Sequence, residues 1–306
     1  MQKPLVSILI PTYNRPVYFK QALISAIVQS YSNIEIIICD DSTNDESQKI
    51  VLKYINKFPH KIKYYKNKTT IGGRLNFQLA LQKANGQYIN FLMDDDLFHP
   101  QKIERMMQYF LQNNNNIKLI TSYRQPIDDT GNKLSDFSFT KKKFHTDTII
   151  DGITASNSMI LDGNWIGEPT TPLFRKKDLI EPFGHFNGTQ YYSAVDMASW
   201  LSLLSNGNLL YMSDTLSYLR MHPSNAGKNK DLKIKSTYDW IHMLFHCPRY
   251  KILEHSNHLS KSIQECLHFI EDLYILYPDQ MTQKNKQLLQ FYKYCLRKYQ
   301  KECRNL

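Results

Sequence analysis

The sequence predicts an α/β protein with a mixed, mostly parallel β-sheet flanked by helices, followed by a C-terminal helical extension. Residues 6–93 alternate between short apolar runs and segments with apolar residues at helical spacing, which is typical of a parallel sheet covered on both faces. From about Lys228 glycines become scarce and the helical patterns lengthen. No Gly-x-Gly-x-x-Gly follows the first apolar run and no Gly-x-x-x-x-Gly-Lys-Ser/Thr occurs, which argues against a dinucleotide fold and a P-loop ATPase.

Four short apolar runs predict the first strands of this sheet: 6–10, 34–39, 62–65 and 88–93. Continuous runs of this length suit strands that are buried on both faces. Helices are predicted between the runs. One begins at Pro16, a favoured first-turn residue, the next spans residues 45–58, and a third follows Gly72-Gly73. A further helix is predicted to start at Pro100.

The chain has 306 residues and a formal net charge of +10. A basic surface attracts nucleic acid, anionic lipid or anionic substrates. Segment 284–304 holds seven lysines and arginines against one glutamate, which accounts for six of the ten charges. No apolar run is long enough to span a bilayer and no leader peptide is evident at the start, so we expect a cytoplasmic protein. The five scattered cysteines indicate reduced thiols.

Three consecutive acids, Asp94, Asp95 and Asp96, close the apolar run 88–93. Acids at the end of a buried strand repel one another, and a divalent cation or a cationic partner would relieve that repulsion. The alternative is an exposed acidic turn before the helix at Pro100. Polar clusters also follow the first two runs, at 11–15 and 40–42. Because ligands of such sheets bind beyond the carboxyl ends of the strands, we expect the three clusters to converge on one site.

The same segments resemble glycosyltransferase family 2, a large family of inverting enzymes with the GT-A fold, here in a bacterial form. The resemblance rests on four motifs and runs to about His222. They are Val6–Arg15 (VSILIPTYNR), Cys39–Ser42 (CDDS), Gly72–Asn76 (GGRLN) and Asn90–Asp96 (NFLMDDD), with Pro100 four residues further on. It implies a nucleotide-sugar-binding half at 1–100, an acceptor and catalytic half of the same domain at 101–225, and a helical extension at 226–306.

The resemblance also implies the residues that bind the nucleotide-sugar donor. Thr12 and Tyr13, next to Pro11, would pack around the base, and Asp41 would accept a hydrogen bond from a uracil N–H. Asp41 could instead cap the helix after Ser42. Arg74 would lie near the base or the diphosphate, or be a solvated helix side chain. The donor-contacting set is Pro11, Thr12, Tyr13, Asp41, Arg74, Asp94, Asp95 and Arg220.

A divalent metal, Mn²⁺ or Mg²⁺, is implied at the acidic run. Asp94 and Asp96 would frame the donor ribose and the metal, and Asp95 is a candidate direct ligand. The family commonly has an acid at the position of Met93, so the register leaves open which acid binds the metal. His222 would complete the metal or diphosphate site, or be a loop histidine before Pro223.

The second half offers candidates for acceptor binding and catalysis. Residues 123–160 are polar and predict an insertion or a flexible loop. Trp165 could stack on a sugar ring or pack in the core, and Glu168 could bind the acceptor or stabilise its turn. The family places an acidic pair at the start of a later helix, where the second acid is the general base. Here the first acid is replaced by Val195, so Asp196 alone would be the base, unless it only caps the helix.

The tail has an apolar stripe at helical spacing among its basic residues. It predicts either peripheral contact of 284–304 with an anionic membrane, where a lipid-linked acceptor would lie, or a helical cap on the catalytic domain. The function predicted overall is metal-dependent transfer of a hexosyl or N-acetylhexosaminyl group from a UDP-sugar to a glycan, lipid-linked or protein acceptor, in surface polysaccharide or glycoconjugate synthesis. The alternatives are a nucleotidyltransferase, and a basic nucleic-acid-binding protein, for which no binding motif is present.

Overall fold

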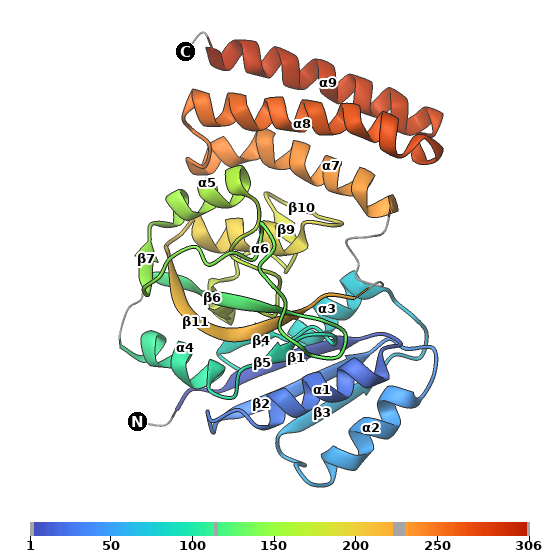
Figure 1. Ribbon diagram of the computed structural model, residues 1–306, viewed down its shortest axis with the longest axis vertical. Coiled ribbons are helices and arrows are strands. Elements are labelled where there is room, and N and C mark those ends of the chain that lie inside the picture. The colour runs from blue at the N-terminus through green and yellow to red at the C-terminus, as the bar shows by residue number, and fades with distance from the viewer. Residues whose placement is uncertain (1–2, 113–115, 223–229, 305–306) are drawn as a thin grey trace.

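A central mixed β-sheet organises the protein, with the strand order β3-β2-β1-β4-β8-β6-β11-β5 and with β7 paired to β11 (Figure 1). The computed structural model describes residues 3–112, 116–222 and 230–304. The strands of the sheet are β1 (Val6–Thr12), β2 (Ile34–Asp40), β3 (Ile62–Lys66), β4 (Tyr88–Phe91), β5 (Leu97–Phe98), β6 (Ile117–Ile127), β7 (Thr148–Ile150), β8 (Leu173–Arg175) and β11 (Asn208–Arg220). Strands β9 (His185–Phe186) and β10 (Thr189–Gln190) form a separate antiparallel hairpin.

The first half of the sheet is parallel, as the sequence predicted. Strand β1 pairs in parallel with β2 and β4, and β2 pairs in parallel with β3. Strand β8 runs antiparallel to both β4 and β6, so it joins the parallel half to the β6–β11 pair. The carboxyl ends of β1, β2 and β4 therefore lie side by side at one edge of the sheet.

Helices cover both faces of this sheet, and a stack of three more helices follows (Figure 1). The helices are α1 (Pro16–Ile27), α2 (Glu46–Ile55), α3 (Gly73–Lys83), α4 (Lys102–Leu111), α5 (Gly152–Asp162), α6 (Val195–Leu204), α7 (Lys230–His246), α8 (Ser256–Leu276) and α9 (Gln283–Arg304). Single-turn 3-10 helices lie at η1 (Lys176–Asp178), η3 (Cys247–Tyr250) and η4 (Pro278–Gln280).

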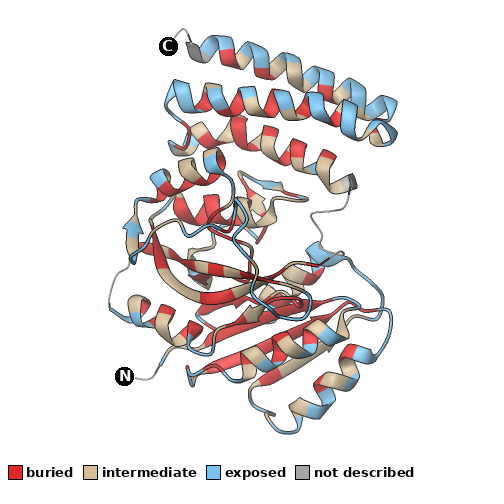
Figure 2. Cartoon of the chain, in the orientation of Figure 1, coloured by how far each residue is buried: buried red, intermediate tan, exposed pale blue. Residues whose placement is uncertain are grey.

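Alternate side chains of the central strands enter two separate cores. Ile8 and Ile10 of β1 pack in a core with α1 and α4, whereas Leu9 packs in the core that contains α3, α6 and the C-terminal helices. Figure 2 shows the buried residues concentrated along the sheet. This two-sided burial explains why the strands are continuous apolar runs rather than alternating ones.

The structure refines the predicted elements at three places. The polar stretch 123–160 contains regular structure that was not predicted, because its start belongs to β6 and residues 152–162 form α5, whose Ala155 and Met159 are fully buried. Strand β4 ends at Phe91, two residues earlier than predicted. Strand β11, which lies outside the four predicted runs, continues to Arg220 because it pairs with β6 along most of its length.

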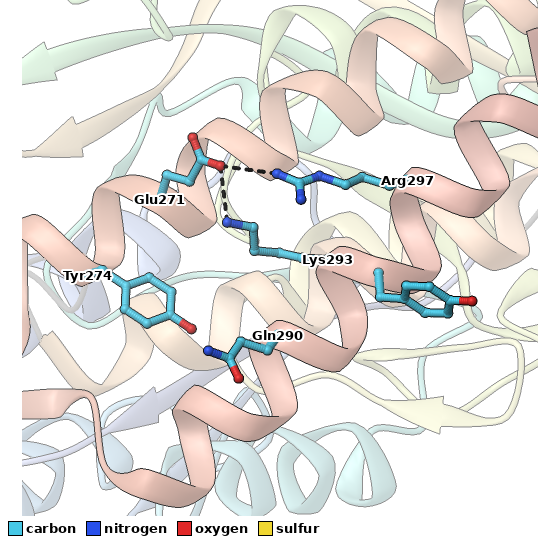
Figure 3. A pocket seen from close by; sticks show the side chains of 6 residues that line it. Glu271, Tyr274, Gln290, Lys293 and Arg297 are labelled. Carbon is cyan, nitrogen blue, oxygen red and sulfur yellow. Dashed lines mark hydrogen bonds and ion pairs between the residues drawn. The ribbon is translucent and has the colours of Figure 1, made fainter.

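The C-terminal extension consists of α7, α8 and α9 packed in sequence. Leu289 and Leu296 of α9 are fully buried, whereas Phe291 is 59% exposed, so the predicted stripe is only partly covered by packing. Lys293 and Arg297 of α9 both bind the Glu271 carboxylate of α8, at the wall of an open groove between the two helices (Figure 3). The predicted boundary at 225/226 falls outside the described residues. In the parts of the chain that the structure describes, no helix is both long and apolar enough to cross a bilayer.

Candidate active site

The three polar clusters converge at the carboxyl ends of β1, β2 and β4, which confirms that expectation. The backbone N–H of Asn14 donates to Ser42 Oγ at 2.8 Å, which joins the loops after β1 and β2. Thr12 Oγ1 donates to Asp94 Oδ2 at 2.9 Å, and the Tyr13 N–H donates to the same oxygen at 3.1 Å. The loop after β4 is thereby fixed to the loop after β1.

Arg15 neutralises two of the three acids of this edge. Its guanidinium lies 2.6 Å from Asp95 Oδ2 and 3.3 Å from Asp94 Oδ1. Both carboxyl groups are nearly buried, and Asp94 is 4% exposed. Burial together with the neighbouring Asp95 charge raises the pKa of Asp94 to about 6, although Arg15 opposes this rise. The acidic run is therefore an enclosed, charge-compensated cluster and not an exposed acidic turn.

His222 meets the acidic run from the end of β11. Its Nε2 lies 3.0 Å from Asp95 Oδ2, and its ring packs at 5.0 Å from the ring of Tyr18. A carboxylate oxygen and an imidazole nitrogen that converge at this distance suit a divalent cation, which would take its remaining ligands from water and donor phosphates. No group of three or more metal-ligating side chains gathers among the described residues. Asp95 and His222 thus fit a metal that one or two side chains hold.

Asp96 and Arg220 are tied to each other inside the protein. The Asp96 carboxylate accepts hydrogen bonds from Thr170 Oγ1 and from the backbone N–H of Arg220, and burial raises its pKa well above the usual value. The Arg220 side chain is fully buried and donates to the Asp95 carbonyl and to Gln21. Contact of Arg220 with a donor diphosphate would require these bonds to be replaced. The geometry therefore favours a structural role for Arg220 over the predicted donor contact.

Asp41 fixes the loop that leads into α3. Its Oδ1 accepts from the Ile71 N–H and its Oδ2 from the Gly72 N–H, both at 2.8 Å. The cap position of α2 is taken by Asp45, so Asp41 does not cap the helix after Ser42. Hydrogen bonding to a uracil N–H stays a prediction. Arg74 lies one residue into α3, where it is exposed.

Asp196 lies at the start of α6, where the loop 163–168 reaches it. Asn164 Nδ2 donates to Asp196 Oδ2 at 2.8 Å, and the Met197 N–H donates to Asp196 Oδ1. Burial raises the pKa of the Asp196 carboxyl to about 7, and the charge of Glu168 contributes to the rise. A carboxylate whose pKa lies near neutral pH is suited to accept a proton from a hydroxyl group. Asp196 also occupies the first turn of α6, but the contacts of its side chain do not include the backbone of the next turn.

The two predicted acceptor residues have different environments. Trp165 is only 6% exposed and donates through Nε1 to Ser158 Oγ, which supports core packing over stacking on a sugar. The Glu168 side chain is 31% exposed and forms an ion pair with Arg124 at 2.7 Å. Arg124 also donates to the carbonyls of Trp165 and Asn164, so it fixes the loop that carries Glu168.

Sequence reasoning missed several residues of this region. Arg15 was expected only as part of a polar cluster, and its pairing with Asp95 was not foreseen. Asn164, Arg124 and Asp239 had no predicted role. Of these, only Arg15 carried a usable signal, because an arginine next to the strand end could have been matched to the acidic run.

Residues 7–167 match the family described as Glycosyl transferase family 2. That match covers 161 of the 306 residues, slightly more than half of the chain. The chain belongs to glycosyl transferase family 2. It is therefore a glycosyltransferase, which confirms the predicted class of enzyme over the nucleotidyltransferase and nucleic-acid-binding alternatives.

Curated relatives carry the same class of name. The chain is 28% identical over 230 residues to an uncharacterized glycosyltransferase of Haemophilus influenzae, covering 75% of this chain and 84% of that protein. It is 26% identical over 238 residues to the putative teichuronic acid biosynthesis glycosyltransferase TuaG of Bacillus subtilis, covering 77% and 86%. A Rickettsia conorii glycosyltransferase is 36% identical over 132 residues, but this chain spans only 21% of that protein's length.

Solved structures confirm the predicted GT-A-like fold of this glycosyltransferase. S. aureus TarS 1-349, in complex with UDP-GlcNAc, matches with a TM-score of 0.62 at 17% identity, covering 94% of this chain and 87% of that one. The mannosyltransferase PcManGT of Pyrobaculum calidifontis, in complex with GDP-Man and Mn2+, matches with a TM-score of 0.57 at 12% identity, covering 98% and 87%.

Proposed function

We propose that this glycosyltransferase moves a sugar from a UDP-sugar to a hydroxyl group of a glycan, lipid-linked or protein acceptor, with inversion at the anomeric carbon and with a divalent metal. The process would be the synthesis of a surface polysaccharide or glycoconjugate. The teichuronic acid name of the B. subtilis relative and the UDP-GlcNAc in the TarS complex support the acceptor class and the donor. The GDP-Man complex of PcManGT makes a GDP-sugar the rival donor.

The observation that carries this proposal is the Asp196 carboxyl group at the start of α6. It accepts one hydrogen bond from Asn164, and burial holds its pKa near 7. At neutral pH a substantial fraction of Asp196 is ionised and can accept a proton, and the neutral acid that forms is not costly at a partly buried site. A solvated aspartate, with a pKa near 4, would be a much weaker base.

The proposed step is a single displacement. Asp196 takes the proton of the acceptor hydroxyl as its oxygen attacks the anomeric carbon. The attack comes from the face opposite the nucleoside diphosphate, the bond from the anomeric carbon to the diphosphate oxygen breaks, and the diphosphate leaves with the electron pair. Asp95 and His222 would hold the Mn²⁺ or Mg²⁺, whose charge stabilises a departing diphosphate. In this proposal Asp94 orients the loop of Thr12 and Tyr13 toward the donor. Asp96 accepts a hydrogen bond from the backbone of Arg220, whose side chain in turn donates to the Asp95 carbonyl.

Replacing Asp196 by asparagine tests the base. Asp196→Asn keeps the side-chain shape and the Asn164 contact but cannot accept the proton, so transfer should fall by about 10²- to 10⁴-fold. UDP binding, measured by calorimetry, should stay within about twofold of the wild type. The matched control is Asp151→Asn, which changes another aspartate at a helix start, the cap of α5, and should leave transfer intact. Unchanged transfer by Asp196→Asn would remove Asp196 as the base.

The donor and the metal need a separate measurement. Purified protein is incubated with UDP- and GDP-sugars and Mn²⁺, and release of the free nucleotide is followed with and without EDTA. We expect slow hydrolysis of a UDP-sugar that EDTA suppresses. Hydrolysis confined to GDP-sugars would change the donor, and full activity in EDTA would contradict the metal.

We also propose that the outer face of α9 contacts an anionic membrane at the cytoplasmic side. Phe291 and Tyr294 of this helix are 59% and 67% exposed, and exposed lysines flank them. Binding to phosphatidylglycerol vesicles but not to phosphatidylcholine vesicles would support this contact. Loss of binding when Phe291 and Tyr294 are changed to serine is expected, and equal binding by that variant would exclude α9 as the contact.

A further inference from the structure

An exposed tyrosine near the start of α6 lies between two cations from distant parts of the chain. The ring of Tyr192 is approached by the Arg74 guanidinium at 5.3 Å and by the Lys235 ammonium at 5.7 Å. Arg74 comes from α3 in the donor half and Lys235 from α7 in the extension. Tyr192 itself is 56% exposed, so the ring and the two charges are open to a ligand.

Neither cation is held in a salt bridge within the described structure. No ion pair of Arg74 or Lys235 forms among the described residues, whereas Arg15, Arg124 and Lys293 all have such partners. Two positive charges close to one ring make this part of the surface electropositive, and an anion that binds there is attracted to both. The combination of an exposed ring and two cations suits an acidic sugar, because the aromatic ring can contact the apolar surface of the sugar while the cations bind its charge.

This group of residues lies close to the proposed base. Tyr192 precedes Asp196 by four residues, so their Cα atoms are at most about 14 Å apart. Gln78, one helical turn after Arg74, donates to Gln190 at 2.7 Å and holds α3 against this segment. The distance to Asp196 thus fits a short oligosaccharide that reaches from the tyrosine to the reacting hydroxyl.

A buried carboxylate of α7 keeps the tyrosine in place. Asp239 is 4% exposed and accepts hydrogen bonds from the backbone N–H groups of Tyr192, Ser193 and Ala194. Lys235 precedes Asp239 by four residues on α7, so the two side chains lie on one face of that helix. Figure 1 shows α7 passing the β10 hairpin that leads into this segment. One helix of the extension thus both fixes the loop and supplies its second cation.

We propose that Arg74, Tyr192 and Lys235 form a subsite for an acidic group, a carboxylate or a phosphate, of the acceptor glycan. The proposal rests on the proposed function, because it takes Asp196 as the base beside which the acceptor binds. The C-terminal extension then selects acceptors as well as capping the fold. Tyr192 and Lys235 lie on the Asp196 side of the molecule, and Arg74 reaches the ring from α3 of the donor half. We assign the anion to the acceptor because two of the three residues lie on the Asp196 side, and a UDP probe distinguishes it from the donor diphosphate.

The test is calorimetric binding of four probes at low salt: trigalacturonic acid, glucose 6-phosphate, neutral maltotriose and UDP. The key variant is Lys235→Gln, which removes the charge but retains a polar side chain of similar reach. The matched control is Lys233→Gln on the same helix, two residues away and therefore on another face. Full-length wild type and both variants are compared with the same probes.

We expect the wild type to bind at least one acidic probe more tightly than maltotriose. Lys235→Gln should lower the affinity for that probe about three- to fivefold, which is the effect of one exposed charge pair. The affinities of Lys235→Gln for maltotriose and UDP should equal those of the wild type. The affinities of Lys233→Gln for all four probes should also equal those of the wild type.

Three results would overturn the proposal. They are no preference for either acidic probe over maltotriose, an equal loss in Lys233→Gln, and a loss of UDP affinity in Lys235→Gln, which would assign the cation to the donor. A failure of the proposed function looks different, because no nucleotide sugar would then be hydrolysed by the wild type, whatever the probes do.

Discussion

The Arg15 guanidinium lies 2.6 Å from the Asp95 carboxylate, on the same oxygen that His222 contacts at 3.0 Å. A side-chain cation thus neutralises the acid that we propose as the metal ligand. A divalent ion that binds Asp95 must compete with Arg15 for this oxygen. If Asp95 binds the metal as proposed, the Arg15 guanidinium must leave this oxygen when the metal and the donor bind.

Removing the Arg15 charge should strengthen metal binding in the absence of donor. Arg15→Gln is expected to tighten Mn²⁺ binding about tenfold, because the competing positive charge is lost. It should also lower the melting temperature without metal, because two nearly buried carboxyl groups lose their partner. Mn²⁺ affinity is measured by electron paramagnetic resonance of the free ion.

The control for that experiment is Arg105→Gln, which removes an arginine paired with Asp214 away from the strand-end edge. This variant should bind Mn²⁺ as the wild type does. Weaker Mn²⁺ binding by Arg15→Gln than by the wild type would mean that Arg15 supports the metal instead of competing with it.

The hydrogen bond from Asn164 to Asp196 should set the pH dependence of transfer. A base must be ionised, so kcat/KM should be high above the Asp196 pKa of about 7 and fall as the pH drops below it. The bond from Asn164 Nδ2 favours the ionised form. Asn164→Ala should therefore raise this pKa further and move the acidic limb of the profile to higher pH.

Full pH–rate profiles of the wild type and Asn164→Ala distinguish two roles of Asn164. If the bond acts through the pKa, the variant should lose activity mainly near pH 7 and recover toward pH 9. An equal fractional loss at every pH would show that Asn164 positions Asp196 or the acceptor without affecting its ionisation.

The strand-end site was predictable because it follows from local pattern. The buried runs before Asp41 and Asp94 fix parallel strands, and parallel strands bring their carboxyl ends together. Helix α5 was missed although its ends carry signals: the Asp151 side chain caps the Thr154 N–H, and Gly163 with a positive φ of 87° ends the helix. The polar composition of this stretch obscured both signals, the capping aspartate and the glycine twelve residues after it.

The contacts between remote segments could not be predicted. Asp239 meets the Tyr192 segment across 47 residues of sequence, and Asn164 meets Asp196 across 32. Nothing in the local sequence of either partner indicates the other, because such pairs depend on how whole helices and loops pack. The same reason explains why the environment of Arg220 was not predicted. Its guanidinium group suggested a ligand of the donor diphosphate, but Arg220 ends a paired strand and its side chain lies inside the protein.

Asp239 should act on the rate through the loop that it holds. In Asp239→Asn the amide oxygen can take the place of Oδ2 and keep its three backbone hydrogen bonds. The amide NH₂ then takes the place of Oδ1, where it faces the Tyr192 N–H, another donor, and the negative charge that the three N–H groups stabilise is lost. We expect kcat to fall about tenfold because Asp196 follows this loop, while the KM for the donor stays unchanged. Steady-state kinetics with varied donor gives both values.

The matched control for Asp239→Asn is Asp151→Asn at the cap of α5, which lies outside the loop before Asp196. It should change neither kcat nor KM. If Asp239→Asn lowers the thermal stability but leaves kcat unchanged, Asp239 has a purely structural role.

Arg220 provides the test of whether a predicted donor ligand is instead a structural one. Its fully buried guanidinium donates to the carbonyls of Asp95, Asp128 and Asp129 and stacks on Tyr18, so the loop after β4 and the turn after β6 are held by one side chain. Arg220→Lys loses the planar set of donors and should lower the free energy of unfolding by about 3–5 kcal/mol. Chemical denaturation measures this loss.

The milder change Gln21→Leu removes only the acceptor of one Arg220 hydrogen bond, and it should give a smaller loss of stability while the protein stays folded. If Arg220 is structural, the KM for the donor in Gln21→Leu and in Arg220→Lys, assayed at a temperature where each is folded, should equal that of the wild type. A large rise in donor KM with unchanged stability would restore Arg220 to the diphosphate site, because only a direct contact loses affinity without weakening the fold.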